Sequence, residues 1–411
     1  MFTREDARII HSLARRVKEI SELPLEEKKR DMWRKHTSLA GCRPPVFVSP
    51  EGSWTEMIPE ESLLCTDAFA REAEYELRKR IFRHEYVKDD TPVECAFDIP
   101  VSSIPINEGW GLTARRIHGT ERGSWRFQPV VEKLSDWKGL KQPKLVMDEK
   151  GADEKVKMLG DAAGEYLSVS KTGIKIFDFH IAHIYCDFRG LDNMLVDLID
   201  EENMVEDVFS FIKEGLKGLV DEALAYGLIT ANNDYTYHYS GGLGYTNDFS
   251  HARNARVGLE GVWAASEAQE FSCVSPEMFA RFILPHEREL LAPFGLNGYG
   301  CCDDLTDKLE SVLTIKNLRR VAACPWANLK KMADRLKKDY ILTWKPNPAY
   351  LAAEKFDEIN LKKYLTQSLM DAKSGYPEII LRDTHTCRGE KERFTRFVEI
   401  AREAIDSVYA C

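Results

Sequence analysis

The sequence predicts an α/β fold, a (β/α)8 barrel (a TIM barrel) with a helical N-terminal extension. Short apolar runs alternate with amphipathic helical patterns, and ionisable residues follow directly after several of these runs. No internal repeat or low-complexity linker divides the chain, whose 411 residues suffice for one elaborated barrel or two ordinary domains. We therefore expect the extension over residues 1–40 and a single barrel domain over residues 41–411.

The first half of the chain opens with helical patterns. Thr3 and Asp6 resemble a capping box, and apolar residues then recur at helical spacing until Pro44 and Pro45 end the region. Residues 109–144 are polar, carry scattered tryptophans and fit no barrel repeat, so we expect an insertion over one end of the barrel. The elements predicted here are strands at 46–48, 93–101 and 173–180, and helices at about 67–82 and 151–165.

The second half repeats strand and helix more regularly. Residues 201–226 carry one apolar stripe, and Gly227 stands where a helix C-terminus is expected. Ser275 and Pro276 announce another helix. The predicted strands are 228–231, 296–300, 318–323, 340–344 and 377–382, and the other helices are 275–291, 328–337, 351–372 and 390–408. About eight strands result, which is the number that a closed (β/α)8 barrel needs.

Composition excludes several classes of function. The net charge of −10 argues against nucleic acid as the main partner, because phosphate binding needs clustered lysine and arginine. We find no apolar run long enough to span a membrane and no signal-peptide core after Met1, so we expect a cytoplasmic protein. The ten cysteines have no disulfide-framework spacing and are expected to be reduced thiols. The sequence leaves a homodimer open.

Thiols and a histidine lie at the ends of two predicted strands. Cys301 and Cys302 follow the strand at 296–300, and His385 and Cys387 follow the strand at 377–382. If a barrel brings these ends together, Cys301, His385 and Cys387 are suitable ligands for a zinc ion. Only one of the two adjacent cysteines can face such a site. The alternative is that these cysteines are small buried hydrophobic residues and that the histidine is exposed.

Other polar residues are candidates for the active site. Asp98 lies in an apolar strand, where a carboxylate needs a function or a structural partner such as Arg115 or Arg116. Polar and aromatic residues follow the strand at 228–231, and they either bind substrate or pack between barrel and loop. Two further pairs are candidates, each with a structural alternative. They are His180 and His183 at the end of the third strand, and Glu267 and Glu270. The candidates for substrate binding are His180, Asp234, Tyr235, His238 and Glu270.

From about residue 92 to the end, the chain resembles the uroporphyrinogen decarboxylase superfamily, and most closely its cobalamin-dependent methyltransferases. The matching segments are 96–100 with Gly109, 275–279 with Pro285, 296–303 and 385–387. Two departures stand out. The arginine-rich segment of the porphyrin decarboxylases is absent around Arg43, which argues against porphyrin decarboxylation. Tyr299 occupies the place of the histidine in the methyltransferases' His-x-Cys motif.

The resemblance implies a zinc-dependent methyltransferase that moves a methyl group between a small methylated substrate and a corrinoid (cobalamin) carried by a partner protein. An aromatic methyl ether, and hence O-demethylation, is our preferred substrate class. Cys301, Cys387 and, in place of the family's histidine, His385 would hold the zinc, while Asp98 or Tyr299 would supply or hold a proton. Two alternatives remain: a methylcorrinoid:thiol methyltransferase, and a metal-free decarboxylase or lyase that uses Asp98.

Overall fold

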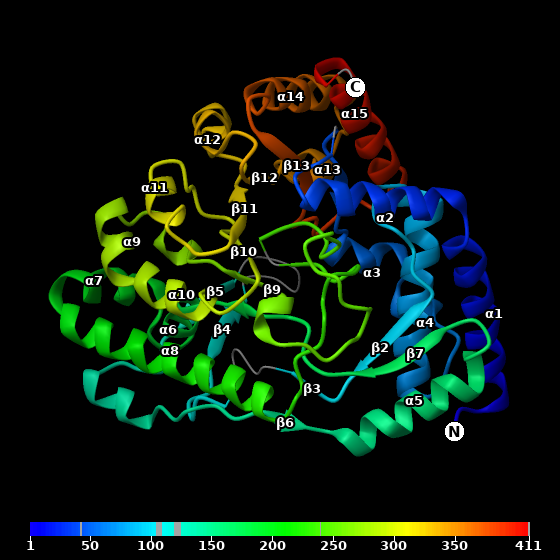
Figure 1. Ribbon diagram of the computed structural model, residues 1–411, viewed down its shortest axis with the longest axis horizontal. Helices are drawn as coiled ribbons and strands as arrows, with labels where there is room; N and C mark the ends of the chain where they lie inside the picture. The colour runs from blue at the N-terminus through cyan, green and yellow to red at the C-terminus, as the bar shows by residue number, and fades with distance from the viewer. Residues whose placement is uncertain (42, 104–108, 119–124, 239, 410–411) are drawn as a thin grey trace.

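The computed structural model describes residues 1–411 except 42, 104–108, 119–124, 239 and 410–411. Seven strands form a parallel sheet in the order β1-β13-β12-β11-β10-β9-β8, and helices lie around its outside (Figure 1). The strands are β1 (Val46–Val48), β8 (Asp178–Phe179), β9 (Trp263–Ser266), β10 (Leu296–Tyr299), β11 (Leu318–Ala323), β12 (Ile341–Trp344) and β13 (Tyr376–Leu381). Because the strands are parallel, the residues after their C-terminal ends gather at one edge of the sheet.

The remaining strands form separate pairs. β2 (Ala96–Pro100) pairs in parallel with β7 (Ser168–Thr172). The antiparallel pairs are β3 (Ser102–Ser103) with β6 (Val146–Met147), and β4 (Arg115–His118) with β5 (Trp125–Gln128). Among the described residues no ladder joins β1 to β2, so the sheet does not close into a ring. The fold is a barrel-like mixed α/β structure, and the closed barrel that we predicted is absent from these pairings. The predicted insertion at about 109–144 contains β4 and β5, and its residues 119–124 lie outside the described part of the chain.

The strand predicted at 228–231 is not formed, and one strand of the seven-stranded sheet was not predicted. Residues 228–231 make only isolated bridges, from Ile229 to Ile174 and from Thr230 to Arg256. The place between β8 and β10 belongs to β9, which is fully buried. Apart from its tryptophan, β9 consists of alanine and serine, so it lacks the β-branched and bulky residues that mark a strand in a sequence.

The helices largely follow the predicted pattern, with two of them divided. The helix predicted at 275–291 breaks at Ile283, just before Pro285, and the helix predicted at 351–372 is interrupted near residues 353–357. None of the described helices is long and apolar enough to cross a membrane. The α-helices are α1 (Arg4–Ser21), α2 (Pro24–Thr37), α3 (Trp54–Met57), α4 (Ala68–Phe82), α5 (Glu149–Ala163), α6 (Ile181–Arg189), α7 (Leu191–Asp200), α8 (Glu202–Ala225), α9 (Pro276–Phe282), α10 (Leu284–Leu291), α11 (Leu309–Val312), α12 (Leu329–Leu336), α13 (Ala349–Ala352), α14 (Glu358–Asp371) and α15 (Glu392–Val408).

The predicted N-terminal extension consists mainly of α1 and α2. The Thr3 hydroxyl caps α1 by accepting the N–H of Asp6 at 3.0 Å. On α2, Trp33 is fully buried, and its indole N–H donates to the carbonyl of Asp90 at 2.8 Å. Trp33 packs in one cluster with Phe47 of β1 and Ile380 of β13, so α2 is bound to the sheet by an apolar contact.

The segment between α8 and β9 fills the interior of the sheet. Tyr237 and Leu243 form an antiparallel bridge, and we call residues 236–244 the inner hairpin, of which 239 is outside the described residues. Gly241 lies so close to Thr343 of β12 that a Cβ there would overlap its Cγ2 atom. Figure 1 shows the segment in green, in the middle of the molecule. The inner hairpin therefore occupies the space that the strands' own side chains fill in a regular barrel.

A buried charge network supports the inner hairpin. The guanidinium of Arg320 lies 3.3 Å from the carboxylate of Glu378, and it donates to the carbonyl of Leu243 at 2.8 Å. It also lies 4.6 Å from the ring centroid of Trp263, within cation–π range. The imidazole of His36 on α2 approaches the other oxygen of Glu378 at 3.3 Å. Strands, inner hairpin and α2 are thus joined by one network of polar contacts around the Arg320–Glu378 pair.

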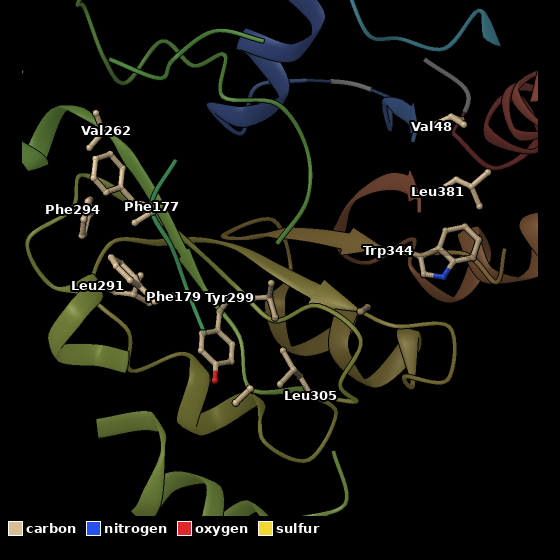
Figure 2. Packing of buried hydrophobic residues seen from close by; sticks show 14 of the residues in the cluster. Val48, Phe177, Phe179, Val262, Leu291, Phe294, Tyr299, Leu305, Trp344 and Leu381 are labelled. Carbon is tan, nitrogen blue, oxygen red and sulfur yellow. The ribbon is translucent and has the colours of Figure 1, made fainter. Parts of the chain in front are cut away.

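Aromatic residues pack the outer face of β8 and β9. Phe294 lies 5.1 Å from Phe177 and 5.8 Å from Phe179, measured between ring centroids. Figure 2 shows these rings beside Leu291 and Val262. This packing fixes the position of the C-terminal end of β8. The first residue of the candidate site follows directly after that end.

Candidate functional site

Ionisable side chains follow the C-terminal ends of six of the seven parallel strands, counting the buried thiol of Cys324 after β11. Five of them make up what we call the rim cluster: His180 after β8, Glu267 after β9, Cys301 after β10, Lys345 after β12 and Arg382 after β13. The register pairs Phe179 with Ser266, and Ser266 with Tyr299, so the first three strands end at one level. This edge is where parallel α/β proteins place their active sites.

His180 and Glu267 form a buried ion pair. The imidazole Nδ1 lies 2.7 Å from the Glu267 carboxylate, and both side chains are largely buried. Burial lowers the pKa of His180, but Glu267 raises it more, so that the resulting pKa is about 9. Burial likewise raises the pKa of Glu267, but His180 lowers it below its ordinary value. At neutral pH the pair is therefore an imidazolium and a carboxylate.

A neutral acid lies behind this pair. Glu287 of α10 is fully buried, and it accepts hydrogen bonds from the hydroxyls of Tyr299 at 2.5 Å and Ser266 at 2.9 Å. Burial raises the pKa of Glu287 to about 8. Tyr299, a predicted catalytic residue, is itself fully buried, so its hydroxyl supports Glu287 beneath the rim.

Cys301 is a buried thiol beside a second cysteine. Its Sγ lies 3.6 Å from that of the exposed Cys302, whose Sγ is 4.0 Å from the carboxylate of Asp383. The hydrogen bond from Cys302 and the charge of Lys345 lower the pKa of Cys301 to about 7, against the effect of burial. The structure thus assigns Cys301 to the rim and turns Cys302 toward solvent, as expected for adjacent residues.

Two cations complete the rim cluster. Lys345 is 4% exposed, and its ammonium acts electrostatically on Cys301 and on Tyr237 of the inner hairpin. Arg382 binds the Glu51 carboxylate at 2.7 Å and the Tyr237 hydroxyl at 3.3 Å. The tip of Tyr237 therefore reaches the rim from below.

The predicted zinc ligands do not meet as a group of three. Cys387 is fully buried and lies with its Sγ 3.3 Å from the carboxylate of Glu56. Burial and this carboxylate raise the pKa of Cys387 to about 11, which disfavours the thiolate that zinc requires. His385 is exposed, and Cys301 interacts with Cys302. Throughout the described residues, no group of three or more His, Cys, Asp and Glu side chains is placed to hold a metal ion, so the donors do not fit zinc as arranged.

Asp98, Asp234 and Tyr235 come together in a second polar cluster. The ammonium of Lys175 lies 2.9 Å from Asp98 and 2.5 Å from Asp234, and the Tyr235 hydroxyl donates to Asp98 at 3.1 Å. Arg253 also pairs with Asp98. Burial raises the pKa of Asp98, but Lys175 and Arg253 lower it more, so Asp98 is ionised. The structural alternative of a partnership with Arg115 or Arg116 is not what the structure shows, since Arg116 instead binds Asp187 at 2.8 Å.

This second cluster borders a cavity of about 450 Å³ between α2 and the segment that follows residue 232. Asp234, Tyr235 and Arg253 line it, together with Arg30 and Arg34 from α2. It therefore presents several cations and aromatic rings, although the arginines have carboxylate partners.

The other two predicted substrate-binding residues lie apart from each other. Glu270 sits near the rim, where its carboxylate binds the Nδ1 of His183 at 2.8 Å in a pair parallel to His180–Glu267. His238 is buried in the inner hairpin, and its ring stacks on Trp263 at 5.4 Å. Burial lowers the pKa of His238 well below its ordinary value, so this imidazole is neutral.

Sequence reasoning missed four cations that shape these clusters. Lys345 and Arg382 immediately follow strands that were predicted, so their positions carried the same signal as Cys301. Lys175 lies within a predicted apolar strand, which is a costly place for an unpaired ammonium. Arg253 stands in an irregular loop and offered no such signal.

Comparisons with known proteins find similarity at the level of structure. No protein-family model and no curated protein matches the sequence. Among solved structures, the chain is similar to a methyltransferase from Methanosarcina mazei, with 12% sequence identity and a TM-score of 0.52. The similarity covers 91% of this chain and 98% of that chain. At this level of identity the likeness establishes the fold alone.

Proposed function

We propose that this protein is a methyltransferase and that its rim cluster is the active site. The observation that carries the proposal is the protonated His180, held by Glu267 at the C-terminal edge of the sheet. Removing a methyl group from an ether or amine leaves an electron pair on the oxygen or nitrogen, and a positioned acid makes that group a better leaving group. The likeness to a methyltransferase of the same fold supports this assignment over other acid-catalysed reactions.

In the proposed reaction the bond between the methyl carbon and the substrate oxygen or nitrogen breaks, and its electrons remain on the departing atom. The imidazolium of His180 gives that atom a proton, while Glu267 stabilises the imidazolium before transfer and keeps the ring oriented. Lys345 and Arg382 supply positive charge at the ends of β12 and β13.

A corrinoid carried by a partner protein supplies, when bound, the electron pair that accepts the methyl group. Zinc stays a prediction of the family resemblance, and no step here passes through it, because Cys301, His385 and Cys387 are not gathered as ligands. An aromatic methyl ether remains our preferred substrate class. The reverse transfer to a substrate thiol is the closest variant, and Lys345 would then stabilise the thiolate.

Replacement of His180 tests the assignment. Methyl transfer to free Co(I) cobalamin from a panel of methoxylated aromatics and methylamines can be followed by absorbance, and we expect His180→Gln to lower the rate about 10²–10⁴-fold. Because the reaction needs protonated His180, the wild-type rate should fall as pH rises through about 9. His11→Gln, on the exposed surface of α1, is the control and should keep the wild-type rate. Full activity of His180→Gln, or no methyl donor in the panel, contradicts the proposal.

The second cluster favours one alternative, a metal-free decarboxylase or lyase. Asp98 stands ionised among Lys175, Arg253 and Tyr235, next to the cavity lined by Arg30 and Arg34, and these cations suit a substrate with carboxylates. Under this alternative, carbon dioxide release proceeds without metal or corrinoid, Asp98→Asn abolishes it, and His180→Gln leaves it unchanged.

A further inference from the structure

The ammonium of Lys345 is buried without a partner. The residue is 4% exposed, and its Nζ forms no hydrogen bond within the described part of the chain. No carboxylate in that part of the chain forms an ion pair with it, and the nearby Glu51 instead binds Arg382. Burying an ammonium in this way is strongly unfavourable unless an anion compensates it. Lys345 therefore needs a negative charge beside it, and no carboxylate among the described residues supplies one.

The surroundings of Lys345 define what could bind there. The residue directly follows β12, so its side chain belongs to the rim. Tyr237 supplies a phenol below it, held by a stacked contact with Phe47 at 4.9 Å and by the hydrogen bond to Arg382. This combination of a point cation, a guanidinium and a phenol is suited to the oxygens of a small anion.

The position of Lys345 relative to His180 adds a constraint on shape. Lys345 follows β12 and His180 follows β8, four places apart in the sheet. A molecule that contacts both must extend along the C-terminal edge of the sheet, from the end of β12 to the end of β8. Its reacting methyl group then lies at one end, beside the proton donor, and its anionic group lies at the other.

We propose that Lys345 binds the carboxylate of an elongated methylated organic acid, with the methyl group at the end opposite the carboxylate. This inference rests on the proposed function and narrows its substrate class. A methoxy-substituted aromatic acid with the methoxy group para to the carboxylate carries the two groups at opposite ends. The competing occupant is internal: a thiolate on Cys301 would satisfy the ammonium without any ligand.

Binding of matched probes distinguishes these two occupants. By isothermal titration calorimetry, we expect the full-length protein to bind 4-methoxybenzoate about 10- to 100-fold more tightly than its neutral analogue 4-methoxybenzamide, the effect of one buried charge-assisted contact. We expect 2-methoxybenzoate, which carries the same charge in a shorter shape, to bind more weakly than the para isomer. Equal affinity for acid and amide overturns the proposal and leaves Cys301 as the counter-ion.

Variants of Lys345 locate the effect. Lys345→Met removes the charge but keeps most of the stem, and it should abolish the preference for the acid over the amide. Lys345→Arg should retain that preference, and Lys331→Met, on the exposed surface of α12, should bind like the wild type. An unchanged preference in Lys345→Met overturns the proposal. If Lys345→Met does not fold, the wild-type and Lys345→Arg measurements decide alone.

The outcome is separable from that of the methyltransferase proposal, because calorimetry requires no turnover. Selective binding of the para acid without methyl transfer supports the carboxylate site and contradicts the proposed reaction. Methyl transfer from neutral ethers, with no selectivity for the acid, does the reverse.

Discussion

Glu287 shows how a single buried residue can make stability depend on pH. It is fully buried, and burial raises its pKa from 4.5 to about 8. In the unfolded chain the same carboxyl ionises near its ordinary value. The folded state therefore binds the proton more tightly. The stabilisation is complete below about pH 4.5 and is lost as the pH rises through about 8.

Glu287→Gln tests this protonation state. Glutamine keeps the shape of the neutral acid and cannot ionise, and its amide NH2 donates to one of the two hydroxyls, which then accepts. Relative to the wild type, the variant should therefore gain stability between pH 5 and pH 8.5, by on the order of a few kcal/mol. Urea unfolding midpoints of both proteins at the two pH values measure the change. A difference that stays constant with pH would show that Glu287 is ionised in the folded protein.

For single residues, the sequence predicted which ones lie at the rim better than it predicted which side chains they contact. His180 and Cys301 were found because they follow apolar runs, and both lie at the rim. The predicted zinc centre placed Cys387 beside Cys301, whereas the chain after β13 contains Asp383 with φ of 57°, in the left-handed region. The chain turns there and brings Cys387 to Glu56, a contact between residues 331 apart that no local pattern encodes.

At the scale of elements, the inner hairpin depends on glycine. Gly241 has φ of 135° and faces Thr343, so both its conformation and its contact exclude a side chain. Nothing local in the glycine-rich sequence at 241–244 shows that the surrounding strands enclose it, so the sequence alone does not predict the inner hairpin. The strand β9 was missed for a similar reason. Its small residues have low intrinsic strand propensity, and contacts with neighbouring strands make this segment a strand.

Alanine substitutions at two glycines test the role of the inner hairpin. Gly241→Ala should lower the free energy of unfolding by on the order of 2–4 kcal/mol, because it combines backbone strain with overlap in the core. Gly218→Ala is the matched control, since this exposed position in α8 has open space around it. It should raise stability by about 0.5–1 kcal/mol. Thermal unfolding measures both, and equal effects would contradict the enclosed position of Gly241.

At the scale of the whole molecule, α2 joins the N-terminal region to the sheet and the inner hairpin. Trp33 contacts a cluster that includes Phe47 of β1, Ile380 of β13, and Leu243 and Tyr245. The sequence predicted the helices of the extension and the number of barrel strands approximately. It could not predict that, among the described residues, the sheet stays open between its edge strands β1 and β8, because closure depends on register and tilt over the entire sheet.

Two tryptophan substitutions test this connection. Trp33→Ala should lower the free energy of unfolding by about 3–5 kcal/mol, the usual cost of removing a fully buried indole. Trp326→Ala, at a position that is 70% exposed, should change it by less than about 0.5 kcal/mol. Chemical denaturation followed by circular dichroism compares the two. A small effect at Trp33 would mean that α2 detaches without consequence for the sheet.

The inner hairpin also limits the space that a ligand can occupy beneath the rim cluster. Its Tyr237 approaches Arg382 at the rim, so this segment lies directly beneath the proposed ligand site. A ligand bound beside Lys345 would contact this phenol, on which the Lys345 ammonium acts electrostatically. The length of the hairpin is therefore a gauge of acceptable ligand size: a shorter turn would admit bulkier compounds, while the strand ends that carry His180 and Lys345 stayed unchanged.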